Sequence, residues 1–327
     1  AVEIINSTQD VVCISSFLFE NDTQICKALY DVSKKGKQVY ILIASQHLVD
    51  AIKEGDEDRE SNKGHIAFLN EAGQGFMFIH SGSVHSKFIL IDPKGPNPQG
   101  LLSTANLTER ALTKNNELGI ILNPNQVKDL FSQFVYGFFS ENTTEFRYDP
   151  ETKKARLEPI STIPRNLAIS QEVIWTTANS TTIGENITKI IKDYSPDDEI
   201  LISCWNFVLD NTVSHAILSK IGSNCKFLIH NSSKNWDGIT KILEKGVKVR
   251  CNALQHAKFI LTKSIAVVFS ANIESQGLEK GFESGAILTD PSELDALRII
   301  FMHWFDNAEE IGRSEERRVG KECRSRW

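Results

Sequence analysis

The fold is decided by the stretch His85-Ser86-Lys87-Phe88-Ile89-Leu90-Ile91-Asp92 and by its second copy, His256-Ala257-Lys258-Phe259-Ile260-Leu261, which begins 171 residues later. In each copy a histidine and a lysine stand two positions apart, and an apolar run follows. Residues two apart on a β-strand point to the same face, so each histidine is expected to project beside its lysine. We therefore expect the chain to contain one structural unit twice.

The residues downstream of the two copies repeat as well. Asn106 follows the first copy and Asn272 the second, and each asparagine is followed 11 positions later by a glutamate, Glu117 or Glu283. The distance from lysine to asparagine differs by five residues, and the extra length falls in residues 93–100, where prolines and glycines indicate a loop. A repeat that changes length only in a loop is typical of a duplicated fold.

Both halves of the chain predict the same order of strands and helices. Apolar runs at residues 10–17 and 198–205 predict buried first strands, and their alternation with helical segments predicts an α/β fold with mixed sheets. Each half should close with a helix that begins at a proline, Pro124 or Pro291, whose apolar stripe is expected in the core rather than against lipid. The other predicted elements are a helix at 23–35, strands at 38–43, 87–91, 118–122, 225–229, 258–261 and 265–269, and helical segments ending at Gly73 and Gly246.

The domain boundaries follow from composition. We expect a first unit over residues 1–140, a polar, proline-containing connector over 141–166, and a second unit over 167–311. Residues 312–327 show no helical or strand period and resemble translated vector sequence, although a native basic tail stays open. Without them the chain has 30 basic residues (36 − 6) against 39 acidic ones (42 − 3), a net charge of −9 instead of −6, which argues against general polyanion binding.

The bulk composition, 41% hydrophobic and 24% charged, is that of an ordinary globular protein. No run approaches the roughly 20 apolar residues of a membrane span, and the six cysteines form no CxxC pair, which favours reduced thiols in a cytoplasmic protein. The chain does not begin with methionine, so a preceding segment or anchor stays open. No metal motif or glycine-rich phosphate loop occurs, so we expect no metal and no other cofactor.

The repeated residues resemble the signature of the phospholipase D superfamily, which is HxK, four residues, Asp, and then a GSxN-like segment and an acidic residue. That family includes phospholipases D, cardiolipin and phosphatidylserine synthases, metal-independent nucleases and tyrosyl-DNA phosphodiesterases. The resemblance covers nearly all of residues 1–310. It implies two similar α/β/α units packed about a pseudo-two-fold axis, with the active site at their interface.

The residue types suit the cleavage of a phosphodiester. Lys87 and Lys258 supply fixed positive charge, and Asn106 and Asn272 supply hydrogen-bond donors, for the charge that develops on the phosphoryl oxygens. One unprotonated histidine attacks phosphorus, and the other, protonated, gives its proton to the leaving oxygen. A phosphohistidine results, which water or an alcohol then releases.

The resemblance assigns roles to the other residues. Following the family's usual order, His85 is the expected nucleophile and His256 the general acid, with the reverse assignment open. Glu117 and Glu283 match the family's acidic position, where a carboxylate can accept the second ring N–H of a histidine. Which glutamate pairs with which histidine cannot be read from the sequence.

Two hydroxyls and one aspartate complete the expected site. Thr104 and Ser270 match the family's hydroxyl position and are expected to donate near the phosphate. Asp92 lies five positions beyond its lysine, too far along the strand to contact the phosphate, so an indirect, orienting role is expected. The second copy has Lys263 at this position, and the usual glycine before the hydroxyl is replaced by Ser103 and Phe269.

Three functions are consistent with these residues. The first is a metal-independent phosphodiesterase that acts on nucleic acid or phospholipid, with a lean to nucleic acid because no membrane span occurs; peripheral membrane contact stays open. The second is a transphosphatidylase similar to cardiolipin or phosphatidylserine synthase. The third is a non-catalytic phosphate-binding module, which would be favoured if the second copy of the motif were losing the residues needed for catalysis. No obligate partner protein is implied.

Overall fold

The computed structural model describes residues 1–45, 59–74, 77–167 and 169–311. The expected tail at 312–327 lies outside the described residues. The first unit contains the strands β1 (Val11–Ser16), β2 (Gln38–Ala44), β3 (Met77–Gly82), β4 (Phe88–Ile91), β5 (Gln99–Ser103), β6 (Gly119–Leu122), β7 (Thr144–Asp149) and β8 (Lys154–Pro159). The second contains β9 (Val173–Thr177), β10 (Ser180–Thr181), β11 (Ile200–Cys204), β12 (Cys225–Ile229), β13 (Lys248–Cys251), β14 (Phe259–Leu261), β15 (Ala266–Phe269), β16 (Glu283–Leu288) and β17 (Glu309–Glu310).

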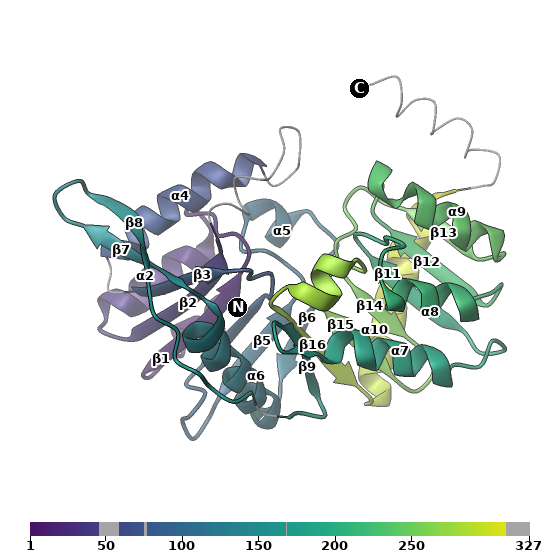
Figure 1. Ribbon diagram of the computed structural model, residues 1–327, viewed down its shortest axis with the longest axis horizontal. Coiled ribbons are helices and arrows are strands. Elements are labelled where there is room, and N and C mark those ends of the chain that lie inside the picture. The colour runs from purple at the N-terminus through teal and green to yellow at the C-terminus, as the bar shows by residue number, and fades with distance from the viewer. Residues whose placement is uncertain (46–58, 75–76, 168, 312–327) are drawn as a thin grey trace.

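The two units lie side by side, and each is built on one mixed sheet (Figure 1). The first sheet has the order β6-β5-β4-β1-β2-β3-β7-β8, and the second has the order β10-β9-β16-β15-β14-β11-β12-β13-β17. The six strands from β6 to β3 therefore recur, in the same order, as the six from β16 to β13. The predicted α/β class with two similar units is confirmed.

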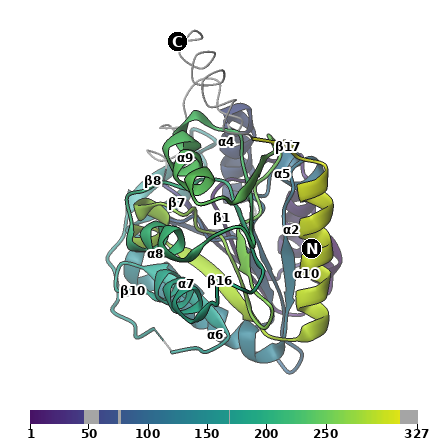
Figure 2. The same cartoon turned by 90° about the vertical axis from the view of Figure 1, so that its right-hand side faces the viewer.

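Helices cover both faces of each sheet, which agrees with the continuous burial of the central strands. The first unit contains α1 (Val2–Asn6), α2 (Gln24–Lys34), α4 (Arg59–Gln74), α5 (Glu109–Thr113), α6 (Pro124–Tyr136) and the π-helix η1 (Gly137–Glu141). The second contains α7 (Thr182–Asp193), α8 (Thr212–Lys220), the 3₁₀ turn η2 (Ser233–Asn235), α9 (Trp236–Glu244), the π-helix η3 (Gln276–Lys280) and α10 (Pro291–Asp306). Figure 2 shows α10 on one side of the second sheet and α7, α8 and α9 on the other.

The two closing helices begin where the prolines predicted. The side chain of Asn123 accepts hydrogen bonds from the backbone N–H groups of Asn125 and Gln126 at the start of α6, and Asp290 caps α10 in the same way. Their apolar stripes lie in the core, as predicted. The residues of these stripes that are buried are Leu130, Phe134, Phe138, Leu294, Leu297, Phe301 and Phe305.

The units share one of their hydrophobic cores. The face of the first sheet that α6 covers packs Leu90 and Phe134 into one cluster with Trp175 of β9 and Phe282, which precedes β16. Buried apolar surface of this kind contributes about 25 cal/mol per Å², so it favours the association of the two units directly.

Residues 144–159 differ from their predicted role as part of a connector. They form the hairpin β7–β8, which extends the first sheet antiparallel to β3, with Phe146 paired to Ile79. The polar composition that suggested a linker reflects an edge position, because most side chains of β8 face solvent.

Candidate active site

The two histidine–lysine motifs lie at one end of the two sheets, where the units meet. His85, Ser86 and Lys87 form an extended segment just before β4, so the predicted strand begins one residue late; His256 and its neighbours stand in the same place before β14. Asn106 and Asn272 follow β5 and β15. The fold therefore gathers both motifs at a single location.

Each histidine segment is held by the backbone of the opposite unit. The carbonyl oxygen of Phe282 accepts hydrogen bonds from the N–H groups of His85 and Ser86, at 2.9 and 2.8 Å. The carbonyl oxygen of Asn116 accepts from the N–H groups of His256 and Ala257, at 3.2 and 2.7 Å. Phe282 and Asn116 are the residues that precede the two glutamates of the motif, so the arrangement obeys the pseudo-two-fold symmetry.

The glutamate side chains cross between the units in the same way, which answers the pairing that the sequence left open. Nδ1 of His85 lies 2.8 Å from Oε1 of Glu283, and Nδ1 of His256 lies 2.7 Å from Oε1 of Glu117. A nitrogen that faces a carboxylate carries the ring proton, so Nε2 of each neutral ring keeps its lone pair. Neither unit alone contains a complete histidine–glutamate pair.

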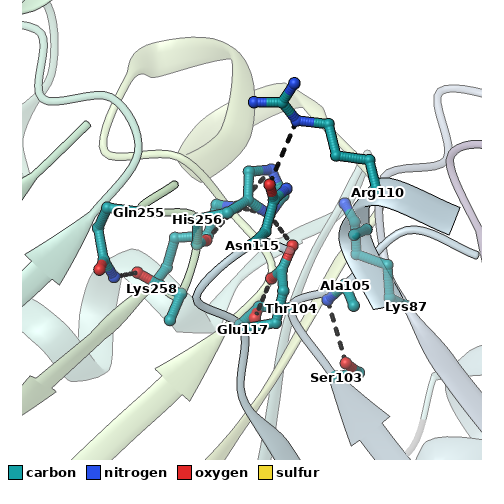
Figure 3. A network of polar contacts seen from close by, with 12 residues as sticks. Lys87, Ser103, Thr104, Ala105, Arg110, Asn115, Glu117, Gln255, His256 and Lys258 are labelled. Atoms are coloured by element: carbon teal, nitrogen blue, oxygen red, sulfur yellow. Dashed lines mark hydrogen bonds and ion pairs between the residues drawn. The ribbon is translucent and has the colours of Figure 1, made fainter. Parts of the chain in front are cut away.

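The two hydroxyls, which were expected to donate near the phosphate, donate to the two glutamates. Thr104 Oγ1 donates to Oε2 of Glu117 at 2.5 Å (Figure 3). In the second unit Ser270 Oγ donates to Oε2 of Glu283. A hydroxyl has one proton to donate, and here the carboxylate takes it. Thr104 and Ser270 therefore fix the glutamates, which in turn orient the histidines.

Both lysines of the motifs are buried beside their histidines. Nζ of Lys87 donates to the backbone oxygen of His85 at 2.5 Å, and Nζ of Lys258 donates to that of His256 at 2.7 Å. Nζ of Lys258 also lies 3.1–3.2 Å from both ring nitrogens of His256. Lys87 and Lys258 are 1% and 0% exposed. Water therefore screens their positive charges only weakly, and these charges act strongly on the neighbouring histidines.

The two asparagines carry an unusual feature for buried amides. Within the described part of the chain, Oδ1 of Asn106 and Oδ1 of Asn272 have no hydrogen-bond partner. Buried polar atoms are rarely left unpaired. The same unpaired acceptor therefore occurs at the two equivalent positions of the repeat.

Burial and the charged neighbours set the protonation states. Burial and then Lys258 lower the pKa of His256 to about 4, although Glu117 raises it. Burial also lowers the pKa of His85, against the effect of Glu283. Burial raises the pKa of each glutamate, but the contact with its histidine, helped by a lysine and a hydroxyl, brings the pKa below the usual value. Both histidines are therefore neutral and both glutamates ionised at neutral pH.

Asp92 lies away from the site, at the other end of β4, and does not orient a histidine. Its two carboxylate oxygens accept from the backbone N–H groups of Gln9, Asp10 and Val11, at 2.8–2.9 Å, where β1 begins. Its φ of 46° is one that aspartate tolerates better than most residues. The equivalent Lys263 is exposed.

Two aromatic residues beside the histidines were not predicted as functional. The ring of Phe17 meets that of His85 edge-on at 5.4 Å between centroids, and the ring of Trp205 lies 5.6 Å from that of His256. Phe17 directly follows β1 and Trp205 directly follows the equivalent strand β11, so aligning the two halves could have identified them. His80, which is near the motif in sequence, instead stacks on Phe138.

Comparison with known proteins agrees with this architecture. Residues 1–136 match a family model described as cardiolipin synthase, PLD-like domain. No curated protein matches the chain. Among solved structures, phosphatidylserine synthase of Haemophilus influenzae Rd KW20 is similar over 99% of this chain and 90% of its own, with a TM-score of 0.65 and 11% identity. The polyphosphate kinase of Porphyromonas gingivalis is similar over 96% of this chain, with a TM-score of 0.62 and 15% identity; this chain spans 46% of it.

At these identities the two solved structures establish the fold alone, a pair of phospholipase D-like α/β units. The family match covers the first unit alone and identifies residues 1–136 as a PLD-like domain.

Proposed function

We propose that the protein is a phosphodiesterase that works without a metal ion and through a phosphohistidine. The observation that carries this proposal is the crossed pairing of His85 with Glu283 and His256 with Glu117. It favours the same tautomer in both histidines, with the ring proton on Nδ1 and the lone pair on Nε2; in the unliganded site the lone pair of His256 faces Nζ of Lys258. Members of the superfamily are phosphodiesterases or phosphatidyl transferases, and either activity uses such a pair.

In the first step, Nε2 of His85 attacks phosphorus and an N–P bond forms. The P–O bond on the far side breaks, and its electron pair takes a proton from Nε2 of His256. Glu283 offsets the positive charge that the phosphorylated ring of His85 acquires. Lys87 and Lys258, with the amides of Asn106 and Asn272, stabilise the phosphoryl oxygens.

In the second step, water attacks the phosphohistidine. Nε2 of His256 takes one proton from the water, the oxygen bonds to phosphorus, and the N–P electron pair returns to His85. An alcohol in place of water would give transfer instead of hydrolysis. The reverse assignment of the two histidines is chemically equivalent and is distinguished by the experiments below.

His256 must be protonated to act as the general acid. In the unliganded site its pKa is lowered to about 4, so at neutral pH most of it is unprotonated. A bound phosphodiester brings a negative charge between Lys87 and Lys258, whose charges help to lower that pKa. Binding therefore raises the pKa of His256 when the proton is needed.

Transfer of a phosphatidyl group is the second candidate function. It is favoured by the match of residues 1–136 to a cardiolipin synthase family and by the structural similarity to a phosphatidylserine synthase over nearly the whole chain. None of the helices in the described residues is long and apolar enough to cross a membrane.

Hydrolysis of bis(p-nitrophenyl) phosphate in excess EDTA tests the proposal. We expect turnover by the wild type and by His215→Ala, an exposed histidine on α8 that serves as control, and a loss of at least about 1,000-fold in His85→Ala. No turnover by the folded wild type, or turnover that EDTA abolishes, would contradict the proposal. Adding glycerol as acceptor and measuring the transfer product separates hydrolase from transferase.

A further inference from the structure

The two sides of the site differ in charge and in aromatic surface, although the units that build them are equivalent. Counting from the two asparagines, Arg110 of the first unit corresponds to Gln276 of the second. The register of β1 with β4 and of β11 with β14 makes Trp205 the equivalent of Phe17. The residues that take part in the proposed chemistry are thus the same in both units, whereas these neighbouring residues differ.

Arg110 belongs to the His256 side. Its Nε donates to Oδ1 of Asn115 at 3.4 Å, and the next residue, Asn116, is the one whose carbonyl holds the backbone of His256. Figure 3 shows the Arg110 side chain reaching from α5 to Asn115. In the second unit the same two positions are Gln276 and Gly281, so at these positions the described residues of the second unit hold no equivalent of this tethered guanidinium.

A second cation is fixed on the same side. Nζ of Lys234 donates to Glu274, whose other carboxylate oxygen accepts from Nδ2 of Asn272 at 3.4 Å. The neighbour of this lysine, Asn235, donates to the backbone oxygen of Trp205 at 2.8 Å. Lys234 is 54% exposed, so its ammonium also reaches solvent.

Trp205 adds a large aromatic ring at this place. It lies 5.6 Å from the rings of both His256 and His230, and it is only partly buried. Two cations are linked to this indole through its neighbours His256 and Asn235, and such a combination suits a ligand with a planar ring and an anionic group. A fatty-acyl chain would use the ring but neither of the two charges.

We propose that Arg110, Lys234 and Trp205 form the subsite of the leaving group, and that this group is a nucleotide. The inference rests on the proposed function, because attack by His85 expels the opposite oxygen toward His256. Trp205 stacks on the base, and Arg110 and Lys234 bind the phosphate that follows the scissile one. The net negative charge of the chain is compatible with such binding, since only a local group of cations is needed.

The test compares two substrates in the same variants, a single-stranded DNA 10-mer and bis(p-nitrophenyl) phosphate, whose leaving group has no second phosphate. We expect Arg110→Gln, which installs the residue of the second unit, to lower kcat/KM for the 10-mer about 10-fold more than for the small diester. Trp205→Ala should lower the ratio of kcat/KM for the 10-mer to kcat/KM for the small diester by about 5- to 100-fold. Lys114→Gln, which removes an exposed charge next to α5, is the matched control and should leave the ratio within about 2-fold.

The outcomes separate the two proposals. Turnover of the small diester by the wild type, with a ratio that neither Arg110→Gln nor Trp205→Ala changes, would overturn the nucleotide subsite and leave the phosphodiesterase intact. Cleavage of phosphatidylglycerol vesicles without cleavage of the 10-mer would overturn it as well. No turnover of either substrate or of the vesicles would count against the proposed function itself. A melting temperature within about 3 °C of the wild type confirms that each variant is folded.

Discussion

The two units keep the same residues where the proposed chemistry takes place and differ at several positions around it. Each contributes a histidine, a lysine and an asparagine, and each lends a glutamate fixed by a hydroxyl to the histidine of the other. By contrast, Asp92 of the first unit is Lys263 in the second, and Trp205 stands where the first unit has Phe17. The comparison separates residues that the reaction needs from residues that serve one unit alone.

Asp92 is an example of a residue that serves one unit alone. In the first unit the connection from β4 to β5 is long, and Asp92 ties its start to the backbone at Gln9–Val11. In the second unit β14 and β15 are joined by a tight turn in which Thr262 bonds to the carbonyl oxygen of Ile265. The second unit therefore closes this connection without an aspartate, which gives a structural reason for Lys263 at the equivalent position.

The largest effect should come from removing the charge of one crossed glutamate. Glu283→Gln and Glu117→Gln should each lower kcat by about 10²- to 10⁴-fold, because the amide no longer fixes the histidine tautomer. The effect of Glu117→Gln should shrink with a p-nitrophenyl leaving group, which needs little protonation, while that of Glu283→Gln should not. Steady-state kinetics with a dinucleotide and with bis(p-nitrophenyl) phosphate measure this. Equal effects on both substrates in both variants would contradict the roles assigned to the two histidines.

Asp92 and Lys263 should differ in stability. Asp92→Ala removes the acceptor of three backbone hydrogen bonds and should lower the free energy of unfolding by about 2–3 kcal/mol. Lys263→Ala should change it by less than about 0.5 kcal/mol, as expected for an exposed side chain. Urea unfolding gives both values, and Asp92→Asn should fall between them. A large loss of kcat in folded Asp92→Ala would mean that the residue acts on the site after all.

Loss of the buried hydroxyls should have a smaller effect. Thr104→Val and Ser270→Ala each remove one hydrogen bond to a glutamate, which should lower kcat about 10-fold with little change in KM. The control pair Thr113→Val and Ser219→Ala removes hydroxyls that bond to backbone on exposed helices. If Thr104→Val raised KM and left kcat unchanged, the hydroxyl would contact substrate, as the sequence suggested.

The pH dependence should shift by about one unit when a neighbour of His256 is neutralised. Free enzyme needs His256 protonated, and the protonated fraction falls as pH rises through its lowered pKa of about 4, so kcat/KM should decline toward neutral and alkaline pH. Lys258→Gln removes a charge that lowers this pKa and should move the decline to higher pH. Glu117→Gln should move it to lower pH. Profiles of kcat/KM with a dinucleotide show both shifts, and shifts of the opposite sign would contradict the assignment of His256 as acid.

The sequence predicted the class of fold and the set of residues that the structure brings together, because the spacing from Asn106 to Glu117 repeats unchanged from Asn272 to Glu283. It could not predict which glutamate meets which histidine, since that depends on how two units pack. The donors Thr104 and Ser270 were assigned to a phosphate, whereas each donates to the glutamate of its own unit, a contact that was not predicted from the sequence. The hairpin at 144–159 was missed because the side chains of an edge strand are as polar as those of a linker.

The most direct test of the central claim is to trap the covalent intermediate. The protein is mixed with bis(p-nitrophenyl) phosphate, quenched, kept at alkaline pH to preserve a phosphoramidate, and digested for peptide mass spectrometry of wild type, His85→Ala and His256→Ala. We expect a nitrophenylphosphoryl adduct on His85 that accumulates in His256→Ala, where the base for hydrolysis is missing, and that is absent from His85→Ala. An adduct on His256 would reverse the two roles, and turnover of the diester with no adduct on either histidine would contradict the mechanism.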